Sequence, residues 1–263
     1  MRQFATKNPY SSHHQRVFGR SRFPIGKALL QKSHPSPLTR DNVEVIDFLR
    51  SPLSGLDREL NMLEHASSFD PETLRYYAEV APVYSASGKN GQNRFLEHFM
   101  SLLEEGSRIL DMGCGSAIDA AALQKRGFNV TAIEASPLLA ARATETLGHN
   151  VRVMRFDELA EVELYDAIWA SASLIHVPRS ALSGVLGKVH RALKPGGIHF
   201  TTYKSGGVEG RDNVGRYYNY PSATELCRFY NLAASWKALE TNEYVGGGFE
   251  NGQGPWVAVE ARR

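Results

Sequence analysis

A glycine-containing turn at the end of an apolar run is the feature of this sequence with the clearest chemical potential. The run 109–112 contains Asp111 and is followed by the tetrapeptide Gly-Cys-Gly-Ser at 113–116. Glycine has no Cβ, so the backbone of such a turn can approach a ligand closely. The helix expected to follow would present free N–H groups to an anionic moiety. The turn therefore predicts a cofactor site.

Two further carboxylates follow later apolar segments and should meet this turn at one edge of a parallel sheet. Glu134 ends the segment 129–134, where a carboxylate can accept hydrogen bonds from both ribose hydroxyls of a cofactor. Asp157 follows the next apolar segment, where it could accept from an adenine amino group. A dinucleotide would need a third glycine where this chain has Ile118, so that alternative is weak. S-adenosylmethionine (SAM) fits better, because Asp111 can hold a cationic ammonium group.

Strand-like and helix-like segments alternate along most of the chain. We expect strands over 108–113, 129–134, 151–156, 165–169, 198–203, 239–245 and 256–261, with a turn at 194–197. We expect helices from Pro71 (capped by Asp70), over 95–103 and 120–126, from Pro137, over 181–193 and from about Ser222. Strands that alternate with helices pair in parallel through right-handed crossovers, so the pattern predicts a doubly wound α/β sheet.

The motifs at 109–115, 130–137, 165–178 and 193–197 together resemble the class I (Rossmann-like) SAM-dependent methyltransferases. The resemblance covers roughly residues 70–263. It implies an α/β fold with a doubly wound, mostly parallel seven-stranded sheet, in which the last strand runs antiparallel at the sheet edge. It also implies SAM as the cofactor.

The resemblance also implies which residues bind the cofactor. Asp111 and the glycines would line its methionine part, Glu134 its ribose, and Asp157 its adenine, while an upstream aromatic pair (Tyr76, Tyr77 or Tyr84) would close over it. The family's usual third glycine is Ala117 here. The full expected set is Tyr76, Tyr77, Asp111, Gly113, Cys114, Gly115, Ser116, Glu134, Ala135, Asp157, Glu158 and Ser171.

Methyl transfer needs alignment and desolvation, and for some acceptors a base near neutral pKa. His176 follows the fourth predicted strand and could be that base, or a structural histidine below the next helix. The polar, aromatic stretch after the fifth strand would form the acceptor pocket, where Arg216 among tyrosines would suit an acidic or planar acceptor. The expected catalytic residues are His176, Tyr203, Arg216 and Tyr218.

The net charge of +2 conceals a basic N-terminal arm. Residues 1–40 contain eight Lys and Arg and no Asp or Glu, so the rest of the chain carries −6. Three interpretations stay open for the arm: a solvated tail, a contact to phosphate or nucleic acid, or a transit peptide for organellar import. We expect residues 1–66 to be a partly helical extension and 67–263 to be the methyltransferase domain.

Composition excludes several other classes of protein. The chain has two cysteines, too few for a disulfide framework, and His13, His14 and His34 have no carboxylate or thiolate beside them, so no metal site is expected. No apolar run suggests a membrane span, and we expect a cytoplasmic protein.

The expected function is SAM-dependent methyl transfer by in-line displacement to a small molecule. The alternatives are a nucleic-acid or protein methyltransferase that uses the arm, and a non-catalytic SAM-binding regulator.

Overall fold

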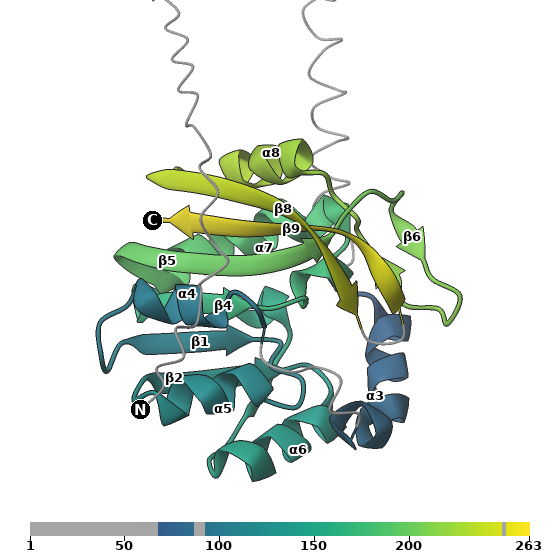
Figure 1. Ribbon diagram of the computed structural model, residues 1–263, viewed down its shortest axis with the longest axis horizontal. Coiled ribbons are helices and arrows are strands. Elements are labelled where there is room, and N and C mark those ends of the chain that lie inside the picture. Colours follow the sequence, from purple (N-terminus) through teal and green to yellow (C-terminus); the bar gives the residue numbers. More distant parts are fainter. Residues whose placement is uncertain (1–67, 87–92, 249–250) are drawn as a thin grey trace, which may run out of the picture. The chain divides into compact units, whose positions relative to one another are not determined.

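The computed structural model describes residues 68–86, 93–248 and 251–263 (Figure 1). The predicted arm, the partly helical extension expected over 1–66 and the domain boundary at 66/67 lie outside these residues. Seven strands form one sheet in the order β3-β2-β1-β4-β5-β9-β8. They are β1 (Arg108–Met112), β2 (Asn129–Glu134), β3 (Arg152–Val153), β4 (Tyr165–Ala170), β5 (Leu193–Lys204), β8 (Ala238–Gly248) and β9 (Asn251–Arg262).

The sheet confirms the predicted doubly wound α/β fold. Strands β1 to β5 pair in parallel, and the last strand, β9, is antiparallel to both of its neighbours, β5 and β8. β9 lies one place inside the sheet edge, because β8 occupies the edge itself. β5 begins at Leu193 instead of 198, since Leu193 pairs with Tyr165 across an irregular register that absorbs the turn expected at 194–197.

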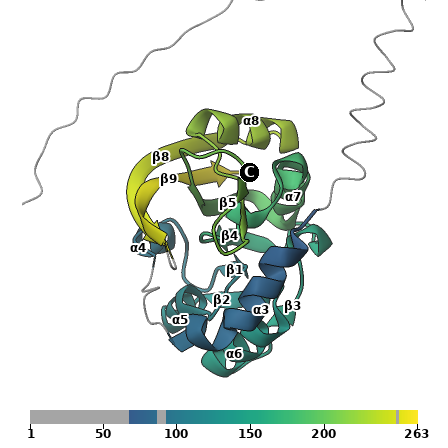
Figure 2. The same cartoon turned by 90° about the vertical axis from the view of Figure 1, so that its right-hand side faces the viewer.

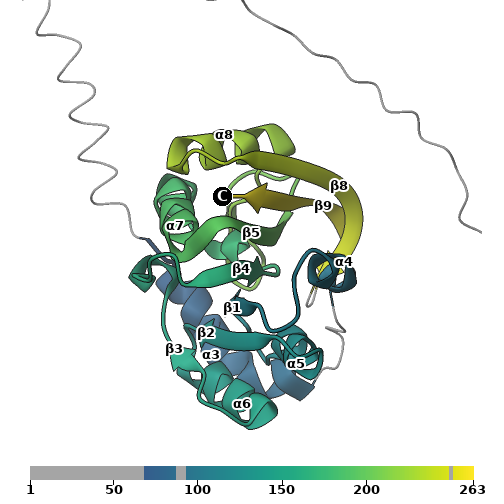
Figure 3. The ribbon, with the colours of Figure 1, turned by 90° about the vertical axis from the view of Figure 1, so that its left-hand side faces the viewer.

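Helices cover both faces of the sheet (Figure 3). On one face, α4 (Leu96–Ser101) and α5 (Ile118–Lys125) pack over an aromatic core in which the Trp169 and Phe200 rings stack, 5.1 Å between centroids. On the other, α7 (Arg179–Ala192) and α8 (Ala223–Ala233) pack over a second buried cluster. α6 (Pro137–Leu147) packs beside α5 against β2. These two layers leave the carboxyl ends of the parallel strands for a site.

The elements gathered at those strand ends come from distant parts of the chain. Figure 1 shows β1 pointing toward α3, β6 and the curved tips of β8 and β9, and Figure 2 shows α3 lying across that end. α3 spans Pro71–Ala86, and β6 (Gly210–Arg211) pairs with β7 (Tyr217–Tyr218) in a separate small hairpin. Among the three described ranges, no helix is both long and apolar enough to cross a membrane.

The start of α3 confirms the predicted cap and fixes the helix to the β6–β7 hairpin. Asp70 Oδ1 accepts hydrogen bonds from the Thr73 backbone N–H and hydroxyl, both at 2.7 Å. Arg211 donates to both Asp70 oxygens at 2.9 and 2.6 Å, and Thr73 Oγ1 accepts from Tyr217 N at 2.8 Å. Burial raises the pKa of Asp70, but the bonds from Arg211 and Thr73 outweigh it and hold that pKa below its usual value.

We expect Asp70→Ala to lower the free energy of unfolding by about 1–2 kcal/mol, because it removes the helix cap together with the ion pair. Asp70→Asn keeps an oxygen for Thr73 and loses only the pairing with the half-exposed Arg211, so it should cost under about 1 kcal/mol. Urea unfolding of both variants, with amide exchange of α3 as a local readout, tests this. An equal loss in both would mean that the ion pair, not the cap, holds the helix.

Candidate functional site

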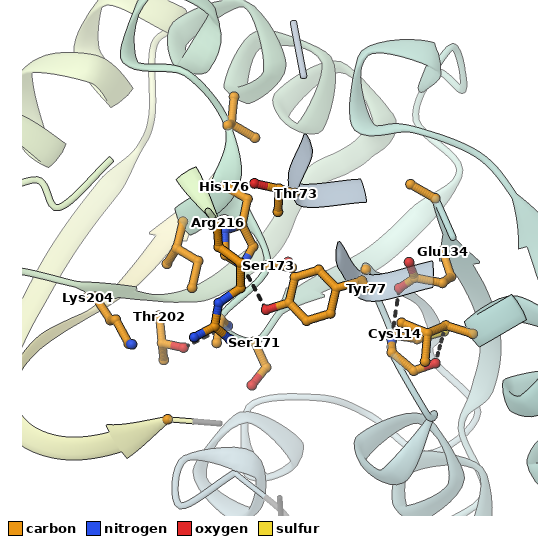
Figure 4. A pocket seen from close by; sticks show the side chains of 18 of the residues that line it. Thr73, Tyr77, Cys114, Glu134, Ser171, Ser173, His176, Thr202, Lys204 and Arg216 are labelled. Atoms are coloured by element: carbon orange, nitrogen blue, oxygen red, sulfur yellow. Dashed lines mark hydrogen bonds between the residues drawn. The ribbon is translucent and has the colours of Figure 1, made fainter. Parts of the chain in front are cut away.

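A cavity of about 360 Å³ lies at the carboxyl ends of the parallel strands. Its lining comes from α3, the glycine turn, the ends of β2, β4 and β5, Arg216 and Tyr218, and the tips of β8 and β9 (Figure 4). Most residues predicted for the site lie here: Tyr77, Tyr84, Asp111, Gly113, Cys114, Gly115, Ser116, Glu134, Ala135, Ser171, His176, Arg216 and Tyr218.

The glycine turn needs its first glycine for two independent reasons. Gly113 has φ +82°, and a Cβ at this position would lie 2.6 Å from the Cβ of Ser173. The Gly113 and Cys114 N–H groups donate to the Ile133 carbonyl at 2.9 and 3.1 Å, which ties the turn to the end of β2. The backbone therefore lies directly against the cavity, with no side chain between.

Glu134 is buried and fixed by backbone donors. Its Oε2 accepts from Gly115 N at 3.0 Å and its Oε1 from Ser136 N at 2.9 Å. Burial raises the pKa of Glu134, and these hydrogen bonds oppose that rise. Each carboxylate oxygen has a second lone pair, so a carboxylate oriented in this way can still accept bonds from ligand hydroxyls.

Asp111 presents an uncompensated buried carboxyl group to the cavity. Within the described part of the chain, no group donates a hydrogen bond to it, and burial, with the charges of Asp119 and Glu134, raises its pKa well above the usual value. Asp119 is better satisfied, since it accepts from Asn93 N and Trp169 Nε1, both at 3.0 Å. A cationic ligand group would stabilise the charged form of Asp111. The residues at this end of the cavity therefore fit SAM, which carries a sulfonium and an ammonium.

Tyr77 and His176 form a neutral hydrogen-bonded pair in the middle of the cavity (Figure 4). His176 Nδ1 lies 2.6 Å from the Tyr217 carbonyl oxygen, which can only accept, so Nδ1 carries the proton. Nε2 must then accept from the Tyr77 hydroxyl, 3.0 Å away. Burial lowers the pKa of His176 to about 4 and raises that of Tyr77 to about 12. This arrangement favours a role for His176 in positioning Tyr77 over the predicted role as a base.

Arg216 forms part of the cavity lining and is held in place by an acidic partner. Its side chain is 1% exposed, and its Nε and Nη2 lie 2.9 and 2.8 Å from Asp212 Oδ2. The guanidinium carbon lies 4.9 Å from the ring centre of Tyr76 and 5.5 Å from that of Tyr218. Tyr76 therefore supports Arg216 from outside the cavity lining instead of contacting the cavity as expected.

Three more predicted residues lie outside the cavity lining: Tyr203, Asp157 and Glu158. Side chains alternate along β5, so Thr202 and Lys204 face the cavity while Tyr203 packs into the buried cluster with Tyr230 on the opposite face. The prediction of Tyr203 as a catalytic residue does not fit this placement.

Asp157 and Glu158 bond to their own neighbour in place of facing the cavity. Asp157 Oδ1 accepts from Arg155 Nε at 3.0 Å, and Glu158 Oε2 accepts from Arg155 N at 2.8 Å. Arg155 itself, with Phe156, lines the cavity at the position where the two acids were expected to border an adenine.

Several lining residues have little or no local signal in the sequence. Trp256 and Tyr244 come from β9 and β8, which the sheet order brings beside β5. Their one local signal is the run of three glycines at 246–248, which permits close approach of the hairpin tip to the cavity. Asn93, whose Nδ2 donates to Ser171 Oγ at 2.9 Å, had no signal.

Comparisons with known proteins agree with this geometry. A family model described as a methyltransferase domain matches residues 89–243. The chain is 30% identical over 146 residues to a sterol 24-C-methyltransferase of Aspergillus fumigatus, covering 52% of this chain and 37% of that protein. It is 35% identical over 103 residues to a ubiquinone biosynthesis O-methyltransferase of Pseudomonas aeruginosa, covering 36% and 43% respectively. These matches span less than half the length of either curated relative.

Solved structures show the same fold at lower identity. The 1,6-didemethyltoxoflavin-N1-methyltransferase of Burkholderia thailandensis aligns with a TM-score of 0.51 at 18% identity, over 88% of this chain and 93% of that one. TehB of Haemophilus influenzae aligns with a TM-score of 0.57 at 16% identity, over 73% and 67%. Both likenesses concern the fold.

We expect Gly113→Ala to destabilise the protein more than Gly106→Ala. Both glycines have positive φ (+82° and +77°), so each substitution costs about 1–2 kcal/mol of backbone strain. Only at position 113 does the new methyl group also clash, because nothing lies within 4 Å of a Cβ at Gly106. Urea unfolding of the two variants compares them directly, and equal losses would show that the turn can move away from Ser173.

Stability should fall with acid through His176. The folded pKa is about 4 against an ordinary 6.5, so between these values the unfolded chain binds a proton that the folded chain does not. The free energy of unfolding is then highest above pH 6.5 and decreases toward pH 4. We expect His176→Gln to reduce this slope by up to about 1.4 kcal/mol per pH unit in urea titrations, and His149→Gln, outside the cavity, to leave it intact. An unchanged slope in His176→Gln would contradict the neutral pair.

Proposed function

The chain belongs to the methyltransferase-domain family, and we propose that it transfers a methyl group from SAM to a small molecule bound in the same cavity. The observation that carries this proposal is the arrangement around the glycine turn, where Glu134 is fixed by Gly115 N–H and Asp111 lies buried beside it. A cavity of about 360 Å³ with α3 and the ends of β8 and β9 in its lining favours a small acceptor over a polymer. The two curated relatives are named for methylation of sterols and for ubiquinone biosynthesis, which agrees with an acceptor of this kind.

The residues that would hold the cofactor follow from the donors and acceptors of the site. Glu134 would accept from the ribose hydroxyls, and the buried carboxylate of Asp111 would meet the ammonium group. Gly113 and Gly115 would leave room for the methionine part, and Tyr84 lies next to Gly115, 3.2 Å from where its Cβ would be. Phe156 and Leu139 supply apolar surface on the adenine side of this lining.

The chain contributes alignment and the exclusion of water. SAM, when bound, supplies an electrophilic methyl group, so no nucleophilic side chain is required. Holding an acceptor in line with that group can account for about 7–11 kcal/mol of a barrier. Tyr77, fixed by His176, lies between the cofactor side and the acceptor side of the cavity and would orient the acceptor (Figure 4).

Formation of S-adenosylhomocysteine by the full chain, with SAM and a panel of small hydroxyl, amine and carbon acceptors, tests the activity. Acceptor-dependent product would support the proposal. SAM binding with no turnover on any acceptor would favour a non-catalytic SAM-binding protein.

We expect Glu134→Gln to weaken SAM binding by about 1.5–3 kcal/mol, because the substitution removes a charged acceptor of ribose hydrogen bonds. Isothermal titration with SAM measures the change. Glu104→Gln, on an exposed loop, serves as the matched control and should bind like the unmodified chain. An unchanged affinity in Glu134→Gln would place the ribose elsewhere.

A further inference from the structure

The cavity has an acidic end, formed by Asp111, Asp119 and Glu134, and a basic aromatic end opposite it. We propose that the methyl acceptor is a small planar organic anion held at the basic end between Lys204 and Arg216. This inference rests on the proposed methyl transfer and specifies its substrate class. Figure 4 shows Lys204, Thr202 and Arg216 on one side of Tyr77, and Glu134 and Cys114 on the other. Tyr77, which is hydrogen-bonded to His176, thus lies between the two ends.

Lys204 lies within an aromatic enclosure at the end of β5. Its side chain is largely buried, and Nζ lies 4.6 Å from the ring centre of Tyr218 and 5.8 Å from that of Trp256. A Cβ at Gly248 would lie 3.1 Å from Lys204 Cε, so the glycine lets the end of β8 lie directly against the lysine. A cation in such an enclosure is well placed to bind an anion, because water screens its charge less here than on the protein surface.

Arg216 presents a second cation of fixed orientation to the same space. Asp212 holds the guanidinium through Nε and Nη2, and the rings of Tyr76 and Tyr218 lie against it. Asp212 occupies the Nε and Nη2 donors, so Arg216 contributes to this end of the cavity a planar, permanent positive charge in a fixed position. Arg94, whose guanidinium carbon lies 5.1 Å from the ring centre of Tyr244, adds a third lining cation on this side.

The aromatic walls favour a flat acceptor. The Tyr244 and Trp256 rings are stacked at 6.2 Å with 25° between their planes, and both line the cavity next to Lys204. Aromatic faces of this kind pack well on a planar ring. An anionic group on that ring would be drawn to Lys204 and Arg216 and repelled from Asp111 and Glu134, so charge alone would orient the acceptor with its opposite edge toward the cofactor side.

Benzoate and its neutral isostere benzamide are the probes that separate charge from shape. We expect the full chain, saturated with S-adenosylhomocysteine, to bind benzoate roughly tenfold more tightly than benzamide in isothermal titration. Lys204→Met should reduce this preference to about threefold or less, and Arg216→Gln should do the same. Lys125→Met removes an exposed lysine outside the cavity and should keep the full preference.

Three results would overturn the inference. Benzoate and benzamide could bind equally or not at all, the preference could survive in Lys204→Met, or Lys204→Met could lose affinity for S-adenosylhomocysteine. The last result would assign the lysine to the cofactor's own carboxylate. Arg216 is buried, so circular dichroism of Arg216→Gln, compared with the charge-conserving Arg216→Lys, checks that the variant folds. Lys204→Met decides the question independently. Failure of the proposed function is distinct, because the unmodified chain would then form no S-adenosylhomocysteine from SAM with any acceptor, whatever its preference between benzoate and benzamide.

Discussion

Three carboxylates lie together at one end of the cavity, those of the buried Asp111 and Glu134 and of the half-buried Asp119, and the structure around them is arranged to make this possible. A buried charge is costly unless hydrogen bonds or an opposite charge offset the lost water. Glu134 receives two backbone N–H groups, and Asp119 receives Asn93 N and the Trp169 indole. Asp111, whose pKa burial raises well above its usual value, receives none from the described residues, so a bound cation is the natural compensation.

This constraint explains why distant elements converge. Gly115 can reach Glu134 only because β1 and β2 run parallel and end together, and because the turn has no side chain at Gly113. The indole of Trp169 reaches Asp119 because β4 lies on the other side of β1. The acidic end therefore depends on the order of the central strands. The basic end depends on β5, which carries Lys204, on the β6–β7 hairpin, which carries Arg216, and on β8 and β9 beside β5 in the sheet.

How much of the site could be predicted depends on how local its signals are. Asp111, the glycines and Glu134 could be placed from sequence, because each belongs to a short motif at a strand end. Tyr203 was misplaced because alternation along β5 shows that neighbours face opposite sides without showing which side faces the site. Asp157 was expected to contact the cofactor, but its carboxylate is instead hydrogen-bonded to Arg155, two residues before it in the chain. Trp256 enters only through the position of β9 beside β5, a long-range pairing that no local pattern reveals.

The neutral pair between the two charged ends limits what kind of catalysis the chain can provide. A protonated histidine beside Tyr77 would repel a cationic cofactor group. It would also draw the anionic group of an acceptor away from its proposed place between Lys204 and Arg216. With a pKa near 4, His176 stays uncharged, and its tautomer, set by the Tyr217 carbonyl, keeps the Tyr77 hydroxyl in one orientation. The Tyr77–His176 pair itself thus carries no charge, and it can contribute steric alignment at the centre of the cavity. Alignment, more than stabilisation of a developing charge, is then the main contribution that these residues can make.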